Sequence, residues 1–75
     1  MFDGIINYIE GKYRPYKIMI TYKDGKFNMY SADTRFLTES LSLVEFYNKY
    51  KEAIKSSPYH SEFMAAVLGR THDAV

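Results

Sequence analysis

The feature that most constrains the fold is an Asp24-Gly25 pair between two runs of alternating apolar and polar residues. Both residue types readily adopt the positive φ angles of a type I′ turn, which joins two neighbouring antiparallel strands. The flanking runs, residues 16–23 and 26–31, are rich in Tyr, Ile, Phe and other residues that favour strands. The sequence therefore predicts a β-hairpin.

The two-residue turn fixes the register of this hairpin and places Ile20 opposite Met29. Successive side chains of a strand point to opposite faces of the sheet. The face predicted to point to the core carries Tyr16, Ile18, Ile20, Tyr22, Phe27 and Met29. The second face carries Lys17, Met19, Thr21, Lys23, Lys26, Asn28 and Tyr30. On it, Met19 lies opposite Tyr30, and the pair forms an apolar spot among lysines.

The segment before the hairpin has two interpretations. Its apolar residues follow the spacing of one helical face, with Asp3 as the N-cap and Gly11 just beyond the end: Phe2, Ile5, Ile6 and Ile9. A strand over residues 3–10 stays open as the alternative, because adjacent apolar residues also suit a strand. In that case the sheet would gain a third member and one covered edge.

A helix start is well specified after the hairpin. The connection is expected to run from Ala32 to Ser40, and residues 42–45 then have the pattern of a capping box, in which Ser42 and Glu45 bind each other's backbone N–H groups. The apolar face of this helix is formed by Leu43, Phe46, Tyr47, Tyr50, Ala53 and Ile54.

A second helix follows, with either Ser57 or Ser61 as its N-cap and Gly69 as its end. Its buried face is expected to consist of Tyr59, Phe63, Ala66 and Val67. Residues 70–75 are expected to be a frayed tail.

These elements predict a small α+β fold that occupies residues 1–75 as a single domain. A short N-terminal helix and a β-hairpin are followed by two helices, which pack on one face of the sheet because a two-stranded sheet needs helical cover to be stable. A two-stranded sheet also has two open edges, so we expect the chain to form a homodimer or another homo-oligomer.

The composition argues against an enzyme. The chain contains no cysteine, and His60 and His72 lack the i, i+4 spacing that places two metal ligands on one helical face. No serine lies in a glycine-flanked turn, the scattered glycines form no phosphate-binding loop, and no two carboxylates form a pair suited to acid–base catalysis. We therefore expect no catalytic, cofactor-binding or metal-binding residues.

Membrane insertion is also unsupported. No apolar run approaches the roughly 18 residues that cross a bilayer, and the start of the chain lacks the basic region of a signal peptide. A cytoplasmic protein is expected. The abundance of Lys, Tyr, Asn and Ile resembles AT-rich bacterial or bacteriophage coding, so a bacteriophage or another mobile element is the expected source.

Tyrosine is the most unusual component, at eight of 75 residues. Tyrosine combines a large apolar ring with one polar tip and is enriched at protein interfaces. The first hypothesis is therefore a small protein-binding modulator or inhibitor of a larger protein. The candidate partner-binding residues are Lys12, Tyr13, Arg14, Lys17, Met19, Lys23, Lys26 and Tyr30.

The alternative hypothesis is a nucleic-acid-binding accessory protein. Residues 12–26 contain five basic residues and one acidic residue, a local net charge of +4, and the candidates for stacking on bases are Tyr13 and Tyr30. Lysine and arginine bind phosphates, while tyrosines stack on bases. The net charge of the whole chain is only +1, which favours the protein-binding hypothesis over this one.

Overall fold

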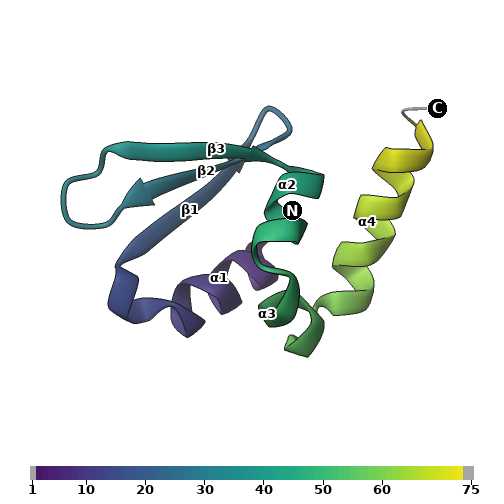
Figure 1. The fold of residues 1–75 in the computed structure, drawn as a ribbon, viewed down its shortest axis with the longest axis horizontal. Helices are drawn as coiled ribbons and strands as arrows, with labels where there is room; N and C mark the ends of the chain where they lie inside the picture. Colours follow the sequence, from purple (N-terminus) through teal and green to yellow (C-terminus); the bar gives the residue numbers. More distant parts are fainter. Residues whose placement is uncertain (1, 74–75) are drawn as a thin grey trace.

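The computed structural model describes residues 2–73 and shows an N-terminal helix, a three-stranded antiparallel sheet and further helices (Figure 1). The first part of the chain forms α1 (Asp3–Lys12), the short 3₁₀ helix η1 (Arg14–Tyr16), β1 (Ile18–Lys23) and β2 (Lys26–Ser31). The second part forms β3 (Leu37–Ser42), α2 (Leu43–Lys49), α3 (Lys51–Ser56) and α4 (His60–Asp73). This arrangement confirms the predicted α+β fold.

The hairpin has the predicted turn and register. Asp24 and Gly25 have φ angles of 54° and 76°, as a type I′ turn requires, and Ile20 lies opposite Met29. The first strand begins at Ile18 and not at Tyr16, because Pro15 lies in η1. Tyr16 is therefore 75% exposed, and its predicted place in the core is wrong.

A third strand occupies part of the segment predicted as an irregular connection. Strand β3 pairs with β2, so that Phe27 lies opposite Leu41 and the strand order is β1-β2-β3. A β-bulge interrupts the pairing between Met29 and Tyr30, where the Thr38 hydroxyl donates to the Met29 carbonyl at 3.0 Å. Since β3 reads Leu-Thr-Glu-Ser-Leu-Ser, pairing with β2 and not intrinsic preference makes it a strand.

The N-terminal segment is a helix, which settles the alternative of a strand. Its isoleucines are buried against the sheet. Its ends differ from the prediction, because Phe2 and not Asp3 is the N-cap residue, and Gly11 lies inside the helix, which ends at Lys12. Gly11 does not have a positive φ angle, so it is not the residue that ends the helix.

The capping box at the start of α2 is confirmed. The Ser42 hydroxyl accepts from the Glu45 N–H at 3.1 Å, and the Glu45 carboxylate accepts from the Ser42 N–H at 2.8 Å. The single helix predicted beyond it is divided at Tyr50, where φ is −113° and ψ is 28°. Hydrogen bonds from Tyr50 to Phe46 and from Ile54 to Tyr50 continue across the bend.

Both predicted ends of the last helix are wrong. Helix α4 begins at His60, beyond Ser57, whose hydroxyl instead bonds the Ile54 carbonyl and the Tyr59 N–H. The helix continues through Gly69 to Asp73, so residues 70–73 are helical and the remainder of the predicted tail, residues 74–75, lies outside the described residues. Tyr59 is 37% exposed, although Phe63 and Val67 of the predicted stripe are buried.

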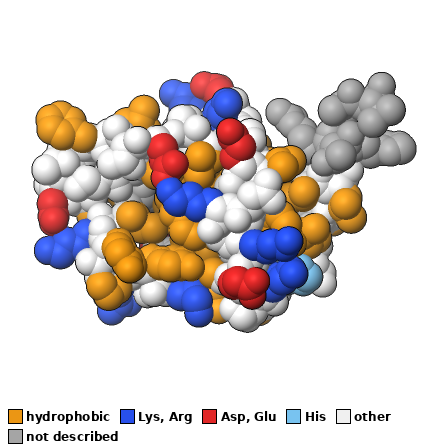
Figure 2. Space-filling model, viewed as in Figure 1, with side chains coloured by type: hydrophobic (Ala, Val, Ile, Leu, Met, Phe, Trp, Pro, Cys, Tyr) orange, Lys and Arg blue, Asp and Glu red, His pale blue; other side chains and the backbone are white. Residues whose placement is uncertain are grey.

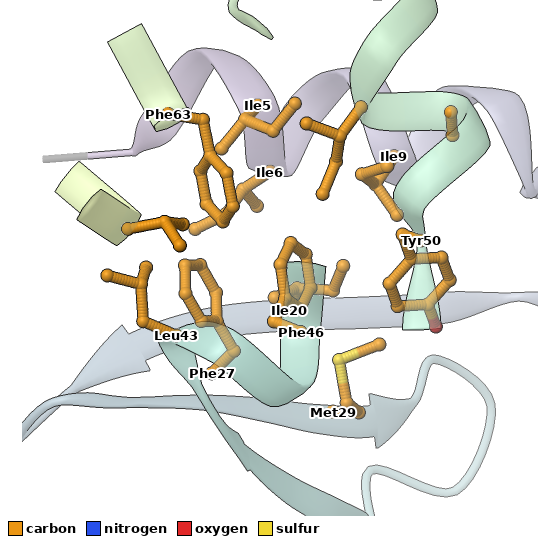
Figure 3. Close-up of a cluster of buried hydrophobic side chains, with 13 residues drawn as sticks. Ile5, Ile6, Ile9, Ile20, Phe27, Met29, Leu43, Phe46, Tyr50 and Phe63 are labelled. Atoms are coloured by element: carbon orange, nitrogen blue, oxygen red, sulfur yellow. The ribbon is translucent and has the colours of Figure 1, made fainter. Parts of the chain in front are cut away.

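The core lies between the sheet and the helices (Figure 3). The rings of Phe27 from β2 and Phe46 from α2 stack with centroids 4.0 Å apart and an interplanar angle of 13°. Phe63 from α4 lies 6.1 Å from Phe27 and 5.9 Å from Phe46, so it closes the cluster from the side of α4. All three rings are at most 1% exposed. The core therefore joins one strand to two helices through aromatic contacts.

The position of Gly11 inside α1 generates a prediction about stability. Because a Cβ atom added there meets no atom within 4 Å, Gly11→Ala is expected to raise the free energy of unfolding by about 0.5–1 kcal/mol through lower chain entropy. Chemical denaturation measures this change. In the control Gly25→Ala, the φ angle of 76° is strained by a side chain, so stability should fall. A destabilising Gly11→Ala would contradict the observed end of α1.

Candidate functional site

The structure distributes the eight predicted partner-binding residues over three places. The group around Tyr13, with Lys12, Arg14 and Lys17, lies between α1 and β1. Met19 and Tyr30 pair in the middle of the sheet, and Lys23 pairs with Lys26 at the turn. Strand β1 separates the first group from the turn by six residues, or roughly 20 Å. The eight residues therefore extend from the end of α1 along the length of the hairpin and are not gathered around one hollow.

The place around Tyr13 is an aromatic hollow, which we call the tyrosine hollow. Its volume is about 270 Å³, and it is lined by Tyr13, Tyr16, Ile18, Lys49 and Tyr50. The Tyr13 ring lies 6.2 Å from the Tyr16 ring and 5.3 Å from the Tyr50 ring. Figure 2 shows apolar side chains gathered at the lower left of this face, where η1 and β1 of Figure 1 approach the helices. Three tyrosines from different segments thus converge.

Backbone features explain how these rings meet. The Tyr13 N–H bonds the Ile9 carbonyl at the end of α1, and Pro15 then favours the short turn of η1. Lys17 follows with a φ angle of 51° and redirects the chain into β1. This sequence of turns leaves Tyr16 exposed beside Tyr13. From the other side, the bend between α2 and α3 presents Tyr50, which is 8% exposed.

Sequence reasoning found one tyrosine of this hollow and missed the others. Tyr13 was a predicted partner-binding residue, whereas Tyr16 was assigned to the core of the hairpin and Tyr50 to a helix face. The preceding Pro15 could have indicated that Tyr16 lies outside the strand, because proline disfavours the continuation of a regular strand. No signal in the sequence indicates that Tyr50, nearly forty positions later, contacts Tyr13.

An ion pair stands at the edge of the tyrosine hollow. The Lys49 ammonium binds the Glu39 carboxylate of β3, and it lies 5.7 Å from the centroid of the Tyr50 ring. The hydrogen bond with Glu39 raises the pKa of Lys49, so the ammonium stays charged at neutral pH. Burial raises the pKa of the Tyr50 hydroxyl, which keeps the phenol neutral.

The basic residues next to Tyr13 leave this end of the molecule with an excess of positive charge. Lys12 and Arg14 are exposed, and within the described part of the chain neither has an ion-pair partner. Lys17 lies 3.7 Å from Asp33, and both side chains are 65% exposed, so water screens their attraction. Two charges thus remain free to attract an acidic partner.

The face of the sheet opposite the core carries a second apolar area. Met19 lies opposite Tyr30, as predicted, and Tyr30 in turn lies opposite Leu37 of β3. The row therefore crosses all three strands. Leu37 is 54% exposed and the adjacent Phe36 is 74% exposed. Sequence reasoning missed both residues because the segment that contains them was interpreted as a connection.

The two lysines at the turn lie apart from the tyrosine hollow, and one of them acts on the capping box. Lys23 and Lys26 lie directly opposite each other and are exposed, so their like charges repel. Lys26 also acts on Glu45 of the capping box. Hydrogen bonds from Ser42 are the main cause that lowers the pKa of Glu45, and the charge of Lys26 lowers it further. Lys26 thus supports the start of α2.

The described residues offer no metal centre, since no three His, Cys, Asp or Glu side chains among them come together as ligands. Within residues 2–73 there is also no helix of sufficient length and apolarity to span a bilayer. No family model matches the chain, and the searches found no curated protein and no solved structure with significant similarity to it.

The buried phenol of Tyr50 generates a prediction about pH dependence. The pKa of this phenol is raised in the folded state, so the neutral phenol contributes to the stability of the fold. This contribution is fully present below the pKa of about 10 that the group has in the unfolded chain, and it is lost as the pH rises through the pKa that it has in the folded chain. Tyr50→Phe should therefore reduce the loss of stability above about pH 10. Denaturation at pH 7 and at alkaline pH measures the difference. An unchanged alkaline slope in Tyr50→Phe would contradict a protonated, desolvated phenol.

Proposed function

We propose that the chain is a small non-catalytic protein that binds a larger cytoplasmic protein through the tyrosine hollow and modulates or inhibits it. The observation that supports this proposal is the convergence of Tyr13, Tyr16 and Tyr50 on one hollow. Tyrosine rings provide large contact areas and lose little conformational entropy on binding, which suits them to interfaces. The exposed ring of Tyr16 is available to a partner without rearrangement of the core.

The hollow favours a particular partner chemistry. Its lining is largely apolar, so it suits an aromatic or aliphatic side chain, and such anchors contribute most of the affinity of many interfaces. Lys12 and Arg14 beside it attract negative charge. The proposed partner therefore presents an apolar anchor residue with Asp or Glu next to it.

Nucleic acid is the less favoured partner. The alternative requires the basic residues of 12–26 to follow one phosphate backbone, but Lys23 and Lys26 lie at the far end of β1. Lys17 is also paired with Asp33. Arg14 beside an exposed Tyr16 remains compatible with a short single strand, so a direct comparison of the two ligand classes is needed.

The test uses two fluorescent peptides, one with a Phe-Leu pair flanked by Asp and Glu and one with Lys in place of the acids. Fluorescence anisotropy should show preferential binding of the acidic peptide, with affinity that falls as salt is added. Tyr16→Ala should weaken this binding roughly tenfold or more, because it removes an exposed aromatic contact from the hollow. Arg14→Glu should abolish the preference for the acidic peptide.

The matched control is Phe36→Ala, which removes a ring of similar exposure outside the hollow and should leave peptide binding unchanged. Equal affinity for both peptides, or full binding by Tyr16→Ala, would contradict the proposal. An oligothymidine that binds at low salt and dissociates steeply with added salt, in the absence of peptide binding, would support the nucleic-acid alternative instead.

A further inference from the structure

The two edges of the sheet differ in how far the rest of the chain covers them. Helix α1 lies beside β1, and the Glu10 carboxylate accepts from the Ile20 N–H at 2.8 Å, so the donor in the middle of this edge is occupied. Strand β3 forms the opposite edge. It contains neither Lys nor Pro, the residues that usually protect an edge from pairing with another strand. The edge of β3 is therefore the more accessible of the two for a further strand.

The register shows which backbone groups of β3 face outward. The turn makes Lys23 and Lys26 a hydrogen-bonded pair, so the alternation of the ladder directs the backbone groups of Asn28 toward β1. Ser40 lies opposite Asn28, and its N–H and C=O therefore point away from β2. The next outward donor, the Ser42 N–H, is already bound by Glu45. Ser40 is the central free position of the edge.

Two of the three exposed apolar residues in or beside β3 are placed symmetrically about Ser40, whereas the third, Leu37, has the buried Leu43 at the symmetric position. Phe36, 74% exposed, precedes Ser40 by four positions, and Val44, 40% exposed, follows it by four positions in the first turn of α2. A two-fold axis at Ser40 would bring Phe36 of each chain toward Val44 of the other. Both residues would lose exposed apolar surface at the two ends of the paired strands.

The charge distribution is compatible with this symmetry. Glu39 is the single charged residue of β3, and its own Lys49 already neutralises it. With the axis at Ser40, each Glu39 lies opposite Leu41 of the second chain and not opposite the other Glu39. No like charges are placed in direct register, where they would destabilise the pair.

We propose that β3 pairs with β3 of a second copy of this chain, in antiparallel orientation and with a two-fold axis at Ser40. The Ser40 N–H of each chain donates to the Ser40 carbonyl of the other, and the two sheets become one sheet of six strands. Because Glu10 blocks the edge of β1, a β1-to-β3 pairing that would extend without end is disfavoured, and the assembly closes as a dimer.

Analytical ultracentrifugation of the full chain and two variants tests this dimer. The wild type should approach twice the chain mass of 8.8 kDa as its concentration rises. Ser40→Pro removes the outward N–H but no backbone hydrogen bond inside the monomer, so it should weaken association roughly tenfold or more. The matched control Ser40→Ala keeps the N–H and loses only the hydroxyl bond to Asn28, and it should dimerise like the wild type.

Two results would overturn the proposal. The first is a wild-type chain that keeps the mass of a monomer up to about 1 mM, a concentration at which even a weak dimer is detected. The second is a Ser40→Pro variant that associates as strongly as Ser40→Ala. If circular dichroism shows Ser40→Pro to be unfolded, hydrogen exchange of the wild type decides. Protection of the Ser40 amide should then increase with protein concentration, and fast exchange at every concentration would refute the pairing.

The position of the axis has its own test. Phe36→Ser and Val44→Ser should each raise the dissociation constant of the dimer. In the double variant the constant should rise by less than the product of the two single increases, because the two residues contact each other across the interface. Fully independent effects would place the axis elsewhere than Ser40.

Discussion

The stacking of Phe27 on Phe46 is the contact on which the rest of the structure depends. Three strands of six residues bury one face only if helices cover it, and this contact ties the central strand to the first helix after the sheet. Phe63 then fixes α4 against the same pair, and the isoleucines of α1 fill the remaining space below β1. With no disulfide and no metal ligand group among the described residues, the small domain depends on this apolar core, in which the aromatic rings pack among aliphatic side chains.

How far the sequence predicts the fold depends on whether local or distant residues determine each element. Asp24-Gly25 and the Ser42–Glu45 capping box act through their own backbone, and both were predicted correctly. Strand β3 was missed because its few apolar residues become a strand only by pairing with β2. The extension of α4 beyond Gly69 was missed because a glycine permits a helix to end but does not require it.

The candidate site was less predictable than the fold for the same reason. Tyr13 was identified from its basic neighbours, which are local in the sequence. Its association with Tyr50 depends on how α1 packs against the bend between α2 and α3, and no periodicity encodes that bend. The predicted lysines are close together in the sequence. In the structure, however, the six residues of β1 hold Lys23 well apart from Lys17. Residues close in sequence were separated, and residues distant in sequence were brought together.

The direct passage from β3 into α2 has a consequence for how the domain opens. Ser42 ends the strand, caps the helix and pairs with Lys26 of β2, so no flexible loop separates sheet from helix. When β3 leaves β2, Ser42 moves with it and carries along the first turn of α2, to which the capping box ties it. Separation of the strand and displacement of α2 are thereby coupled, and neither can occur alone at low cost. A chain of this size gains from such coupling a native state that opens as a whole or not at all.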